Sequence, residues 1–350
     1  MNSSYVLMTE TDILVAGPVG IREVAERAGV SIGTVSNVLN KPGGVKPAYR
    51  LRVTEAMNEL GFVRNDLARQ LRMGGGTTLG MIVLNVANPF FAALAHACEA
   101  AAEEVGYTIV FGSSDQIASR EDRYAELFEM QRVTGMIIAP LDGATTRLEQ
   151  LRRRGMPMVL FDFHADTGQF CSLALDGRRG GYLAARHLIE TGRKHIAFLG
   201  GPLRQVEDRW MGAMEACAET SGVRLSRIDT VDQTVSDGRA AGEALKLEPK
   251  DERPDAIFAA NDLLGLGLMQ SVILATDLRI PEDLAIVGYD DIDYAASAIV
   301  PMSTVRQPVE LLAKEAIRLV LAEKDAGPDH VHEHLLLEPE LTIRESSRPL

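Results

Sequence analysis

Cysteine is scarce in this 350-residue chain, which has only Cys98, Cys171 and Cys217. Their odd number and wide spacing offer neither a disulfide framework nor a CxxC site. Such sparse use of cysteine fits a reducing cytoplasm, where we expect the protein to be found.

Long hydrophobic runs and a secretory leader are also lacking. The most apolar stretch, 79–98, is interrupted by Asn85, Asn88 and Pro89, so we expect no membrane-spanning helix. The start of the chain has no basic n-region, and residues 1–19 are expected to form a disordered leader. A hydrophobic fraction of 46% and a charged fraction of 24% are ordinary for a globular protein, and the length suggests two or three domains.

Positive charge is limited overall but concentrated near the N-terminus. The formal net charge of −13 would by itself argue against a nucleic-acid partner. Residues 20–72 nevertheless hold nine basic and five acidic side chains, so this segment carries +4 and the remainder −17. A small basic head on an acidic body indicates a nucleic-acid-binding module, although chance clustering on a solvated face would give the same balance.

The head has the pattern of a helix-turn-helix. Ile21, Val24 and Ala28 lie on one face of a first helix that ends at Gly29, and Ser31 is suited to cap a second. A third helix follows from about 47 to 60. Two short helices joined by a tight turn form a DNA-reading motif, although a generic helical hairpin has the same periodicity. The residues expected to face DNA on the second helix are Ile32, Gly33, Thr34, Ser36 and Asn37.

A series of short motifs follows in one order along residues 20–347. The head carries GIREVAERAGVSIGTVSNVLN and ELGFVRNDLARQLR, and the body carries NPFF (88–91), HLIETGRKHIAFLGGP (187–202), RWMG (209–212), AANDLLGLG (259–267), VGYDDIDYA (287–295) and STVRQP (303–308). These motifs resemble those of the lactose-repressor (LacI) family of bacterial transcription regulators. The resemblance implies a homodimeric repressor that binds a pseudo-palindromic DNA operator under the control of a small effector.

The segment NDLARQLR is followed by a glycine-rich tract, and a helix this short is marginal in water. The resemblance implies a hinge helix and linker over 65–77 that enters the minor groove, with Leu71 as a wedge between base steps. The hinge residues implied to contact DNA are Asn65, Ala68, Arg69 and Leu71. An ordinary linker helix would use Leu67, Ala68 and Leu71 as its apolar face, so both interpretations stay open.

The body alternates short apolar runs with helical stretches. The strand-like runs are 79–84, 107–112, 135–140, 157–162, 195–200, 256–261 and 284–290, and helices are expected over 88–105, 120–131, 178–190 and 308–323. This alternation predicts an α/β body of two doubly wound parallel sheets. With the resemblance, it implies a helix-turn-helix domain over 20–64 and a periplasmic-binding-protein-like core over 78–350. Lobe 1 is expected at about 78–174 and 308–335, and lobe 2 at about 175–307 and 336–350.

Polar residues follow three of these runs, where doubly wound sheets bind ligands. They are Asp162 after one run, Asn261 and Asp262 after another, and Asp290 and Asp291 after a third. The resemblance adds Asn88, Phe90, Arg209 and Gln307, and Phe163 stands where relatives usually have arginine. Of this set, the expected effector residues are Asn88, Phe90, Asp162, Phe163, Arg209, Asn261, Asp290 and Gln307. The alternative is a structural role, because Asp and Asn commonly cap the helices that follow strands. Because carboxylates make an anionic ligand costly, we expect a neutral sugar. A purine or nucleoside, stacked on Phe90 and Phe163, is the alternative.

Other chemistry is weakly supported. His330, His332 and His334 alternate, which on a strand would suit a metal cluster. No cysteine lies near them in sequence, so we interpret the pattern as incidental and expect no metal or cofactor. No Walker motif, dinucleotide fingerprint or nucleophile–base pairing is present, which argues against an enzyme. The basic head, and a start of the chain that does not resemble a secretory signal peptide, argue against a sugar-binding transport protein.

Overall fold

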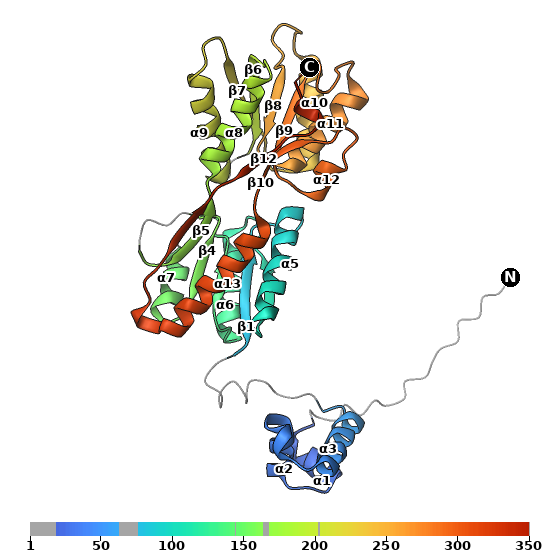
Figure 1. Cartoon of the computed structure of the whole chain (residues 1–350), viewed down its shortest axis with the longest axis vertical. Helices are drawn as coiled ribbons and strands as arrows, with labels where there is room; N and C mark the ends of the chain where they lie inside the picture. The colour runs from blue at the N-terminus through green and yellow to red at the C-terminus, as the bar shows by residue number, and fades with distance from the viewer. Residues whose placement is uncertain (1–18, 63–75, 144, 164–167, 202–203, 350) are drawn as a thin grey trace, which may run out of the picture. The chain divides into compact units, whose positions relative to one another are not determined.

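The computed structural model describes residues 19–62, 76–143, 145–163, 168–201 and 204–349, in two compact units that divide between Gly75 and Gly76 (Figure 1). The head contains α1 (Ile21–Ala28), α2 (Ile32–Asn40), the 3-10 turn η1 (Pro42–Gly44) and α3 (Pro47–Leu60). These elements confirm the predicted helix-turn-helix. Their small core consists of Val24, Ala25, Ala28, Val35, Val53 and Ala56.

The turn between α1 and α2 is fixed by local chemistry. Gly29 ends α1 with a φ of 61°, in the left-handed region that glycine adopts without steric cost. Ser31 caps α2, since its hydroxyl accepts a hydrogen bond from Thr34 N at 3.1 Å. From α3, the Arg52 guanidinium donates to the carbonyls of Ala28 and Gly29, the latter at 2.9 Å. Arg52 therefore fastens the turn to the third helix.

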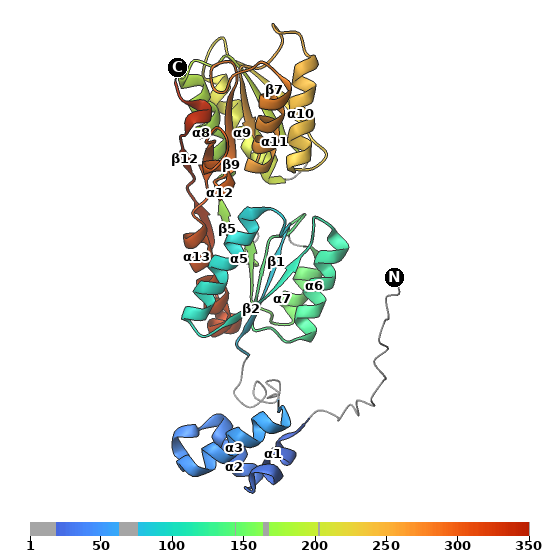
Figure 2. The same cartoon turned by 90° about the vertical axis from the view of Figure 1, so that its right-hand side faces the viewer.

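Lobe 1 is a six-stranded parallel sheet in the order β11-β5-β4-β3-β1-β2. Its strands are β1 (Thr78–Val83), β2 (Thr108–Ser113), β3 (Met136–Ile138), β4 (Met158–Phe161), β5 (Cys171–Leu175) and β11 (His334–Leu337). Figure 2 shows α5 (Pro89–Glu104) and α13 (Val309–Ala326) on one side of the sheet and α6 (Ala118–Met130) and α7 (Thr146–Arg153) on the other. Both faces of the sheet are covered, which is why its inner strands β1, β3, β4 and β5 are buried along almost their whole length.

Lobe 2 repeats this plan with the strand order β12-β10-β9-β8-β6-β7, in which only β12 runs antiparallel to its neighbour. The strands are β6 (His195–Gly200), β7 (Arg224–Asp229), β8 (Ala256–Ala259), β9 (Ala285–Asp290), β10 (Ser303–Arg306) and β12 (Glu340–Thr342). The helices are α8 (Gly177–Glu190), α9 (Arg204–Ala218), α10 (Val235–Leu247), α11 (Asp262–Ala275) and the short α12 (Asp293–Ala296). The fold class predicted from the alternation is confirmed.

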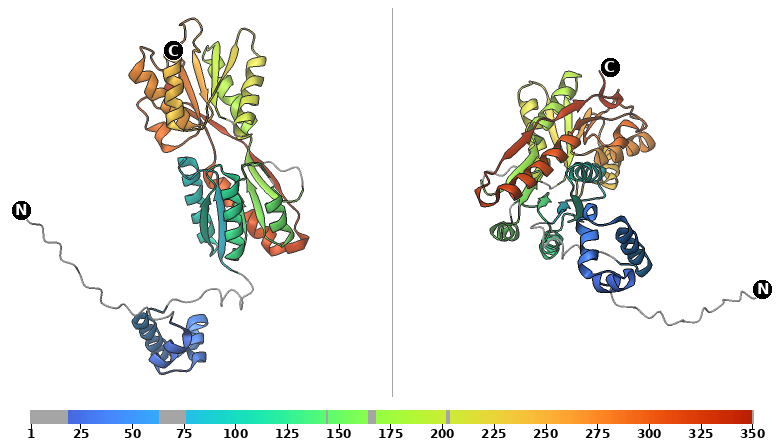
Figure 3. Two further views of the ribbon diagram at one scale, coloured as in Figure 1. Left: turned by 180° about the vertical axis from the view of Figure 1, so that it is seen from behind. Right: turned by 60° about the horizontal axis from the view of Figure 1, so that its bottom comes forward.

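The chain crosses between the lobes three times, as Figures 1 and 3 show. The crossings follow β5, β10 and β11. All seven strand-like runs overlap observed strands, whereas β5, β7, β10, β11 and β12 are additional strands that the apolar runs did not reveal. Edge position explains β7 and β12, which carry charged residues and lack a continuous apolar run. No helix in the described part of the chain has the length and apolar character needed to cross a membrane.

Two glycines allow α8 and α9 to pack backbone to backbone. A Cβ on Gly212 would lie 1.8 Å from Arg178 O, and one on Gly181 would lie 1.9 Å from Arg209 O. Neither contact is tolerable for a real side chain, so a methyl group at either position must separate the helices. The contact at Gly181 also fixes the backbone of Arg209.

We therefore expect Gly212→Ala to lower the free energy of unfolding by about 3 kcal/mol, at the upper end of overpacking costs. Urea unfolding monitored through Trp210, the single tryptophan of the chain, measures the change in lobe 2. Met214→Ala is the control, because Met214 is exposed on the same helix and its loss should change stability by no more than about 0.5 kcal/mol. Equal stabilities for the two variants would contradict this account of the helix pair.

Candidate functional site

The amino-terminal part of α2 presents an open surface. Ile32, Gly33 and Asn37 are exposed, whereas Thr34 and Ser36 are half-buried. The Thr34 hydroxyl lies 2.9 Å from Ser31 Oγ, and Ser36 Oγ lies 3.3 Å from Asn40 Nδ2, so both hydroxyls already have partners within the helix. Of the five expected contact residues, Ile32, Gly33 and Asn37 are the most available to a partner. Asn65, Ala68, Arg69 and Leu71 lie outside the described residues.

A cleft of about 300 Å³ lies between the two lobes of the core. It is reached from the carboxyl ends of the strands, as expected for doubly wound sheets. Its lining includes seven of the eight expected effector residues, namely Asn88, Phe90, Asp162, Arg209, Asn261, Asp290 and Gln307.

Asp290 is a buried carboxylate of the cleft with a raised pKa. It ends β9 with a φ of 113° and is 5% exposed. Its Oδ1 accepts a hydrogen bond from Gln307 Nε2 at 2.8 Å, and its Oδ2 accepts one from Asn88 Nδ2 at 3.4 Å. Burial raises the pKa of Asp290 to about 6, against the opposing effect of the Arg209 charge. The contact with Asn88 joins lobe 2 to lobe 1 directly.

Arg209 is the cationic group of the cleft lining. It is 7% exposed, its Nη1 donates to Ala260 O, and its guanidinium carbon lies 3.6 Å from the centre of the Tyr289 ring. Stacking on an aromatic face holds the plane of the guanidinium. Among the described residues, none accepts a hydrogen bond from the buried Arg209 Nε. A ligand oxygen would satisfy this donor.

Asn88 and Asn261 each use one end of the amide to cap a helix. Asn88 Oδ1 accepts from Phe90 N at 3.0 Å at the start of α5, and Asn261 Oδ1 accepts from Leu264 N at 2.9 Å at the start of α11. The other end of each amide donates at the cleft, from Asn88 to Asp290 and from Asn261 to Gln233 O at 3.2 Å. Helix capping and cleft lining are therefore not alternatives for these residues.

Phe163 is placed differently from the expectation. It is not among the residues that line the cleft; its ring packs against the cluster beneath α6 and α7, beside Gly143. The reason is local, since Asp162 has a φ of 52° and turns the chain at the end of β4. Phe163 consequently lies on the opposite face from Phe161.

Several lining residues were not predicted. Gln116 follows β2, and Asp232, Gln233 and Thr234 follow β7. Gln116 Nε2 lies 3.4 Å from Asp232 Oδ1, which gives a second contact between the lobes. Applying the strand-end rule to the run 107–112 would have indicated Gln116, whereas β7 is polar enough to escape a search for apolar runs.

Asp262 and Asp291, which follow Asn261 and Asp290 in the sequence, are not among the residues that line the cleft and form structural contacts instead. Asp262 is fully buried; its carboxylate accepts from Thr304 Oγ1 at 2.6 Å and from Ile292 N at 2.9 Å. Burial raises the pKa of Asp262 well above its usual value. Asp291 forms ion pairs with Arg306 and Arg344, both at 2.6 Å. These contacts brace the strand ends beneath the cleft.

Comparison with known proteins assigns the family. Residues 20–65 match the family model described as bacterial regulatory proteins, lacI family, and residues 185–347 match a periplasmic binding protein-like domain. The HTH-type transcriptional repressor PurR of Aliivibrio fischeri (strain MJ11) is 32% identical over 331 residues, covering 93% of this chain and 97% of the relative. The chain belongs to the lacI family of bacterial regulatory proteins. It is therefore a DNA-binding transcriptional regulator with an effector-binding core, and not an enzyme.

Solved structures of this family share the architecture. The crystal structure of the lac repressor dimer bound to operator and the anti-inducer ONPF is 26% identical, with a TM-score of 0.80, and the match covers 94% of this chain and 99% of that one. The transcriptional regulator CelR in complex with cellobiose is 31% identical, with a TM-score of 0.66 and the same coverage. A regulator from Enterococcus faecium with bound ribose is 28% identical, with a TM-score of 0.70, covering 78% of this chain and 99% of that one.

The raised pKa of Asp290 makes stability depend on pH. The folded state binds this proton more tightly than the unfolded state, whose aspartate pKa is about 3.9, so burial of Asp290 disfavours folding increasingly as the pH rises from about 4 to about 6. The free energy of unfolding of Asp290→Asn minus that of the wild type should rise over this window, by at most about 3 kcal/mol. Urea unfolding at a series of pH values measures the difference.

The control is Asp283→Asn, because the ion pair with Arg279 lowers the pKa of Asp283 to about 2. Above about pH 4 the free energy of unfolding of this variant should lie below that of the wild type by a constant amount, and this difference should shrink only at lower pH, where Asp283 becomes protonated. Parallel curves for Asp290→Asn and the wild type between pH 4 and 6 would contradict the assigned environment of Asp290.

Proposed function

We propose that this lacI-family regulator is a homodimeric repressor whose affinity for a pseudo-palindromic operator is controlled by a neutral polyhydroxyl effector, a sugar, bound in the cleft between the lobes. The observation that carries the proposal is the group of polar side chains in the lining of that cleft, among which the buried Arg209 Nε lacks an acceptor in the described structure. Action on bacterial DNA places the protein in the cytoplasm.

The charges of the cleft favour a neutral ligand. Among the described residues, Asp162, Asp232 and Asp290 line it together with one cation, Arg209, so this part of the lining would repel an anionic ligand. The neutral amides of Asn88 and Gln307 donate hydrogen bonds to Asp290, and a ligand hydroxyl can replace them as donor. Hydroxyl groups both donate to carboxylates and accept from a guanidinium, which suits this mixture. The cellobiose and ribose complexes of relatives support the choice of a sugar.

The same contacts give the effector a means of acting on the lobes. Asn88–Asp290 and Gln116–Asp232 connect the lobes across the cleft, and Gln307 lies in the crossing between β10 and α13. A sugar that replaces these contacts binds one arrangement of the lobes better than another. That difference in affinity is the thermodynamic requirement for allosteric control. In our proposal the hinge over 65–77, with Leu71 as the wedge, transmits the change to the head.

A purine or nucleoside remains the alternative ligand. Phe90 lines the cleft, but it is only 4% exposed, so little of its ring is available to stack on a base. Phe163, the second ring that would enclose a base, packs elsewhere. A sugar needs no such enclosure, and the structure therefore favours it.

On the DNA side, we expect Asn37 to read a base near the start of α2. The side-chain amide of asparagine suits N6 and N7 of adenine, and such a bidentate pair discriminates by about 1–3 kcal/mol. Selection of operator sites from a randomised library should therefore show relaxed preference at one symmetric pair of positions in Asn37→Ala. Asn40→Ala is the control, because Asn40 is exposed at the other end of α2 and donates to Ser36 O.

An unchanged selected site in Asn37→Ala would exclude this role. The same selection tests the homodimer, because two identical heads require inverted half-sites. Operator binding should also weaken steeply with salt, since Lys and Arg side chains displace counterions from phosphates. A selected site without a dyad would contradict the dimeric arrangement.

Arg209→Ala should abolish the effector response and leave operator binding intact, because the head is a separate unit. A thermal-shift screen of sugars and purines identifies the ligand, since a molecule that binds the folded state raises stability by RT ln(1 + [L]/Kd). Arg227→Ala is the matched control, an arginine of the same lobe that pairs with Glu207 and Asp229 and is absent from the cleft lining.

Retention of the full shift in Arg209→Ala would place the ligand elsewhere. A shift with purines and none with sugars would replace the proposed effector class by the alternative. Loss of the shift in Arg227→Ala as well would indicate general damage to lobe 2 rather than a specific role for Arg209.

A further inference from the structure

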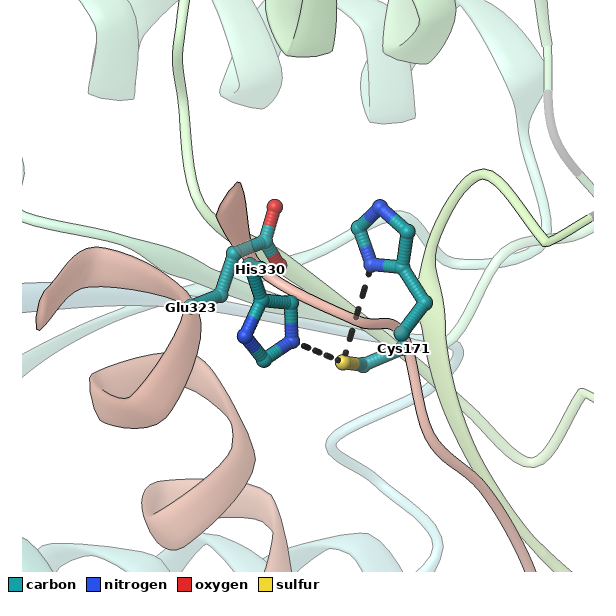
Figure 4. A group of neighbouring side chains, drawn as sticks. Cys171, Glu323 and His330 are labelled. Atoms are coloured by element: carbon teal, nitrogen blue, oxygen red, sulfur yellow. Dashed lines mark hydrogen bonds between the residues drawn. The ribbon is translucent and has the colours of Figure 1, made fainter. Parts of the chain in front are cut away.

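Four metal-ligating side chains from three segments of the chain meet at the amino-terminal end of β5, away from the residues that line the effector cleft (Figure 4). Cys171 begins β5, Glu323 lies in the last turns of α13, and His330 and His332 belong to the segment that leads into β11. One ligand atom from each of the four lies within 4.8 Å of the others. His334, the third of the alternating histidines, instead contacts Ser172 Oγ at 2.9 Å.

The distances in the cluster are close to those of a tetrahedral zinc site. Cys171 Sγ lies 3.1 Å from His330 Nε2 and 3.8 Å from His332 Nδ1. Zinc–sulfur and zinc–nitrogen bonds of ordinary length at a tetrahedral angle place sulfur and nitrogen about 3.6 Å apart. The two observed distances lie on either side of that value. The widest pair of ligand atoms needs to approach by only about 1 Å, which side-chain rotation supplies.

The surroundings hold the ligands in place. Cys171 and Glu323 are buried, and one Glu323 oxygen accepts from Met158 N at 3.1 Å, which ties the carboxylate to β4. The His330 and His332 rings meet edge to face, with centres 5.2 Å apart. Such supporting contacts orient ligands before the metal arrives.

The charges also balance. A thiolate, a carboxylate and two neutral imidazoles together carry −2, which a divalent cation neutralises. The charge of the Arg152 guanidinium acts on Glu323 and His332. Because the ligands and the cation together carry no net charge, Arg152 does not oppose binding of the metal. Binding transfers the thiol proton of Cys171 to solvent, as for other thiolate sites.

We propose that Cys171, Glu323, His330 and His332 form a binding site for a divalent transition metal of the zinc class. The mixed sulfur, nitrogen and oxygen donors select such an ion over Mg²⁺ and Ca²⁺, which prefer oxygen ligands alone. A bound ion joins the end of α13 and the segment before β11 to the sheet of lobe 1. These segments lie at the end of the lobe 1 sheet away from the crossings, so the metal stabilises lobe 1 itself.

The test uses the full-length, untagged protein stripped of metal with a chelator and titrated with Co²⁺. We expect one Co²⁺ per chain, with the visible bands of tetrahedral Co²⁺ and a near-ultraviolet thiolate-to-cobalt band, both removed by added Zn²⁺. Zn²⁺ should raise the melting temperature and Mg²⁺ should leave it unchanged. The thiolate band requires no variant, so a failure of folding in a mutant cannot obscure the result.

Variants then assign the ligands. Cys171→Ser should abolish the thiolate band, whereas Cys98→Ser, which removes a buried cysteine of α5, should keep it. Glu323→Gln retains an acceptor for Met158 N but should weaken Zn²⁺ binding by more than about tenfold, the loss that follows even from removing a supporting contact. His96→Gln, at an exposed histidine of α5, controls for adventitious surface binding.

The absence of a thiolate band in the wild type would overturn the proposal and leave the cluster as a group of hydrogen-bonded side chains. Equal Zn²⁺ affinity in the wild type, Cys171→Ser and Glu323→Gln would overturn it as well, by showing that the ion binds elsewhere.

Discussion

A buried carboxylate at the junction of the two lobes is the constraint on which the core depends. Asp290 ends a central strand of lobe 2, and its oxygens accept from an amide of lobe 1 and an amide of a crossing segment. Burying this charge is unfavourable, as its raised pKa shows. Its two hydrogen bonds connect lobe 2 to lobe 1 and to a crossing segment. In the mechanism that we propose, a ligand that satisfies Asp290 better than the two amides do changes the balance between lobe arrangements.

The rest of the core serves to hold this position. The hydrogen bond between Asp262 and Thr304 stabilises the strand ends, and so do the ion pairs of Asp291. Gly181 brings the backbone of Arg209 against α8, so that the guanidinium stacks on Tyr289, next to Asp290. The position of Arg209 in the cleft is therefore set by the close approach of two backbones and by stacking on a buried ring.

Much of this arrangement was predictable where the signal is local. The head follows from helical periodicity with Gly29 and Ser31 as boundaries, and Asp290 and Asn261 follow from the rule that polar groups gather at strand ends. Prediction from the sequence failed where the direction of a side chain, or a contact between distant segments, determines the position of a residue. The side of β4 on which Phe163 lies depends on the turn at Asp162, and Asp232 follows an edge strand with little apolar character. Cys171 and His330 are 159 residues apart, and only the pairing of β5 with β11 brings them together.

The central claim is that occupation of the cleft and operator binding are thermodynamically coupled. Coupling is reciprocal, so operator DNA must change effector affinity by the same factor as effector changes operator affinity. Calorimetric titration of the identified sugar into free protein and into the protein–operator complex measures this factor directly. The account predicts unequal affinities whose ratio matches the shift in operator affinity. Equal affinities in the two titrations would contradict it.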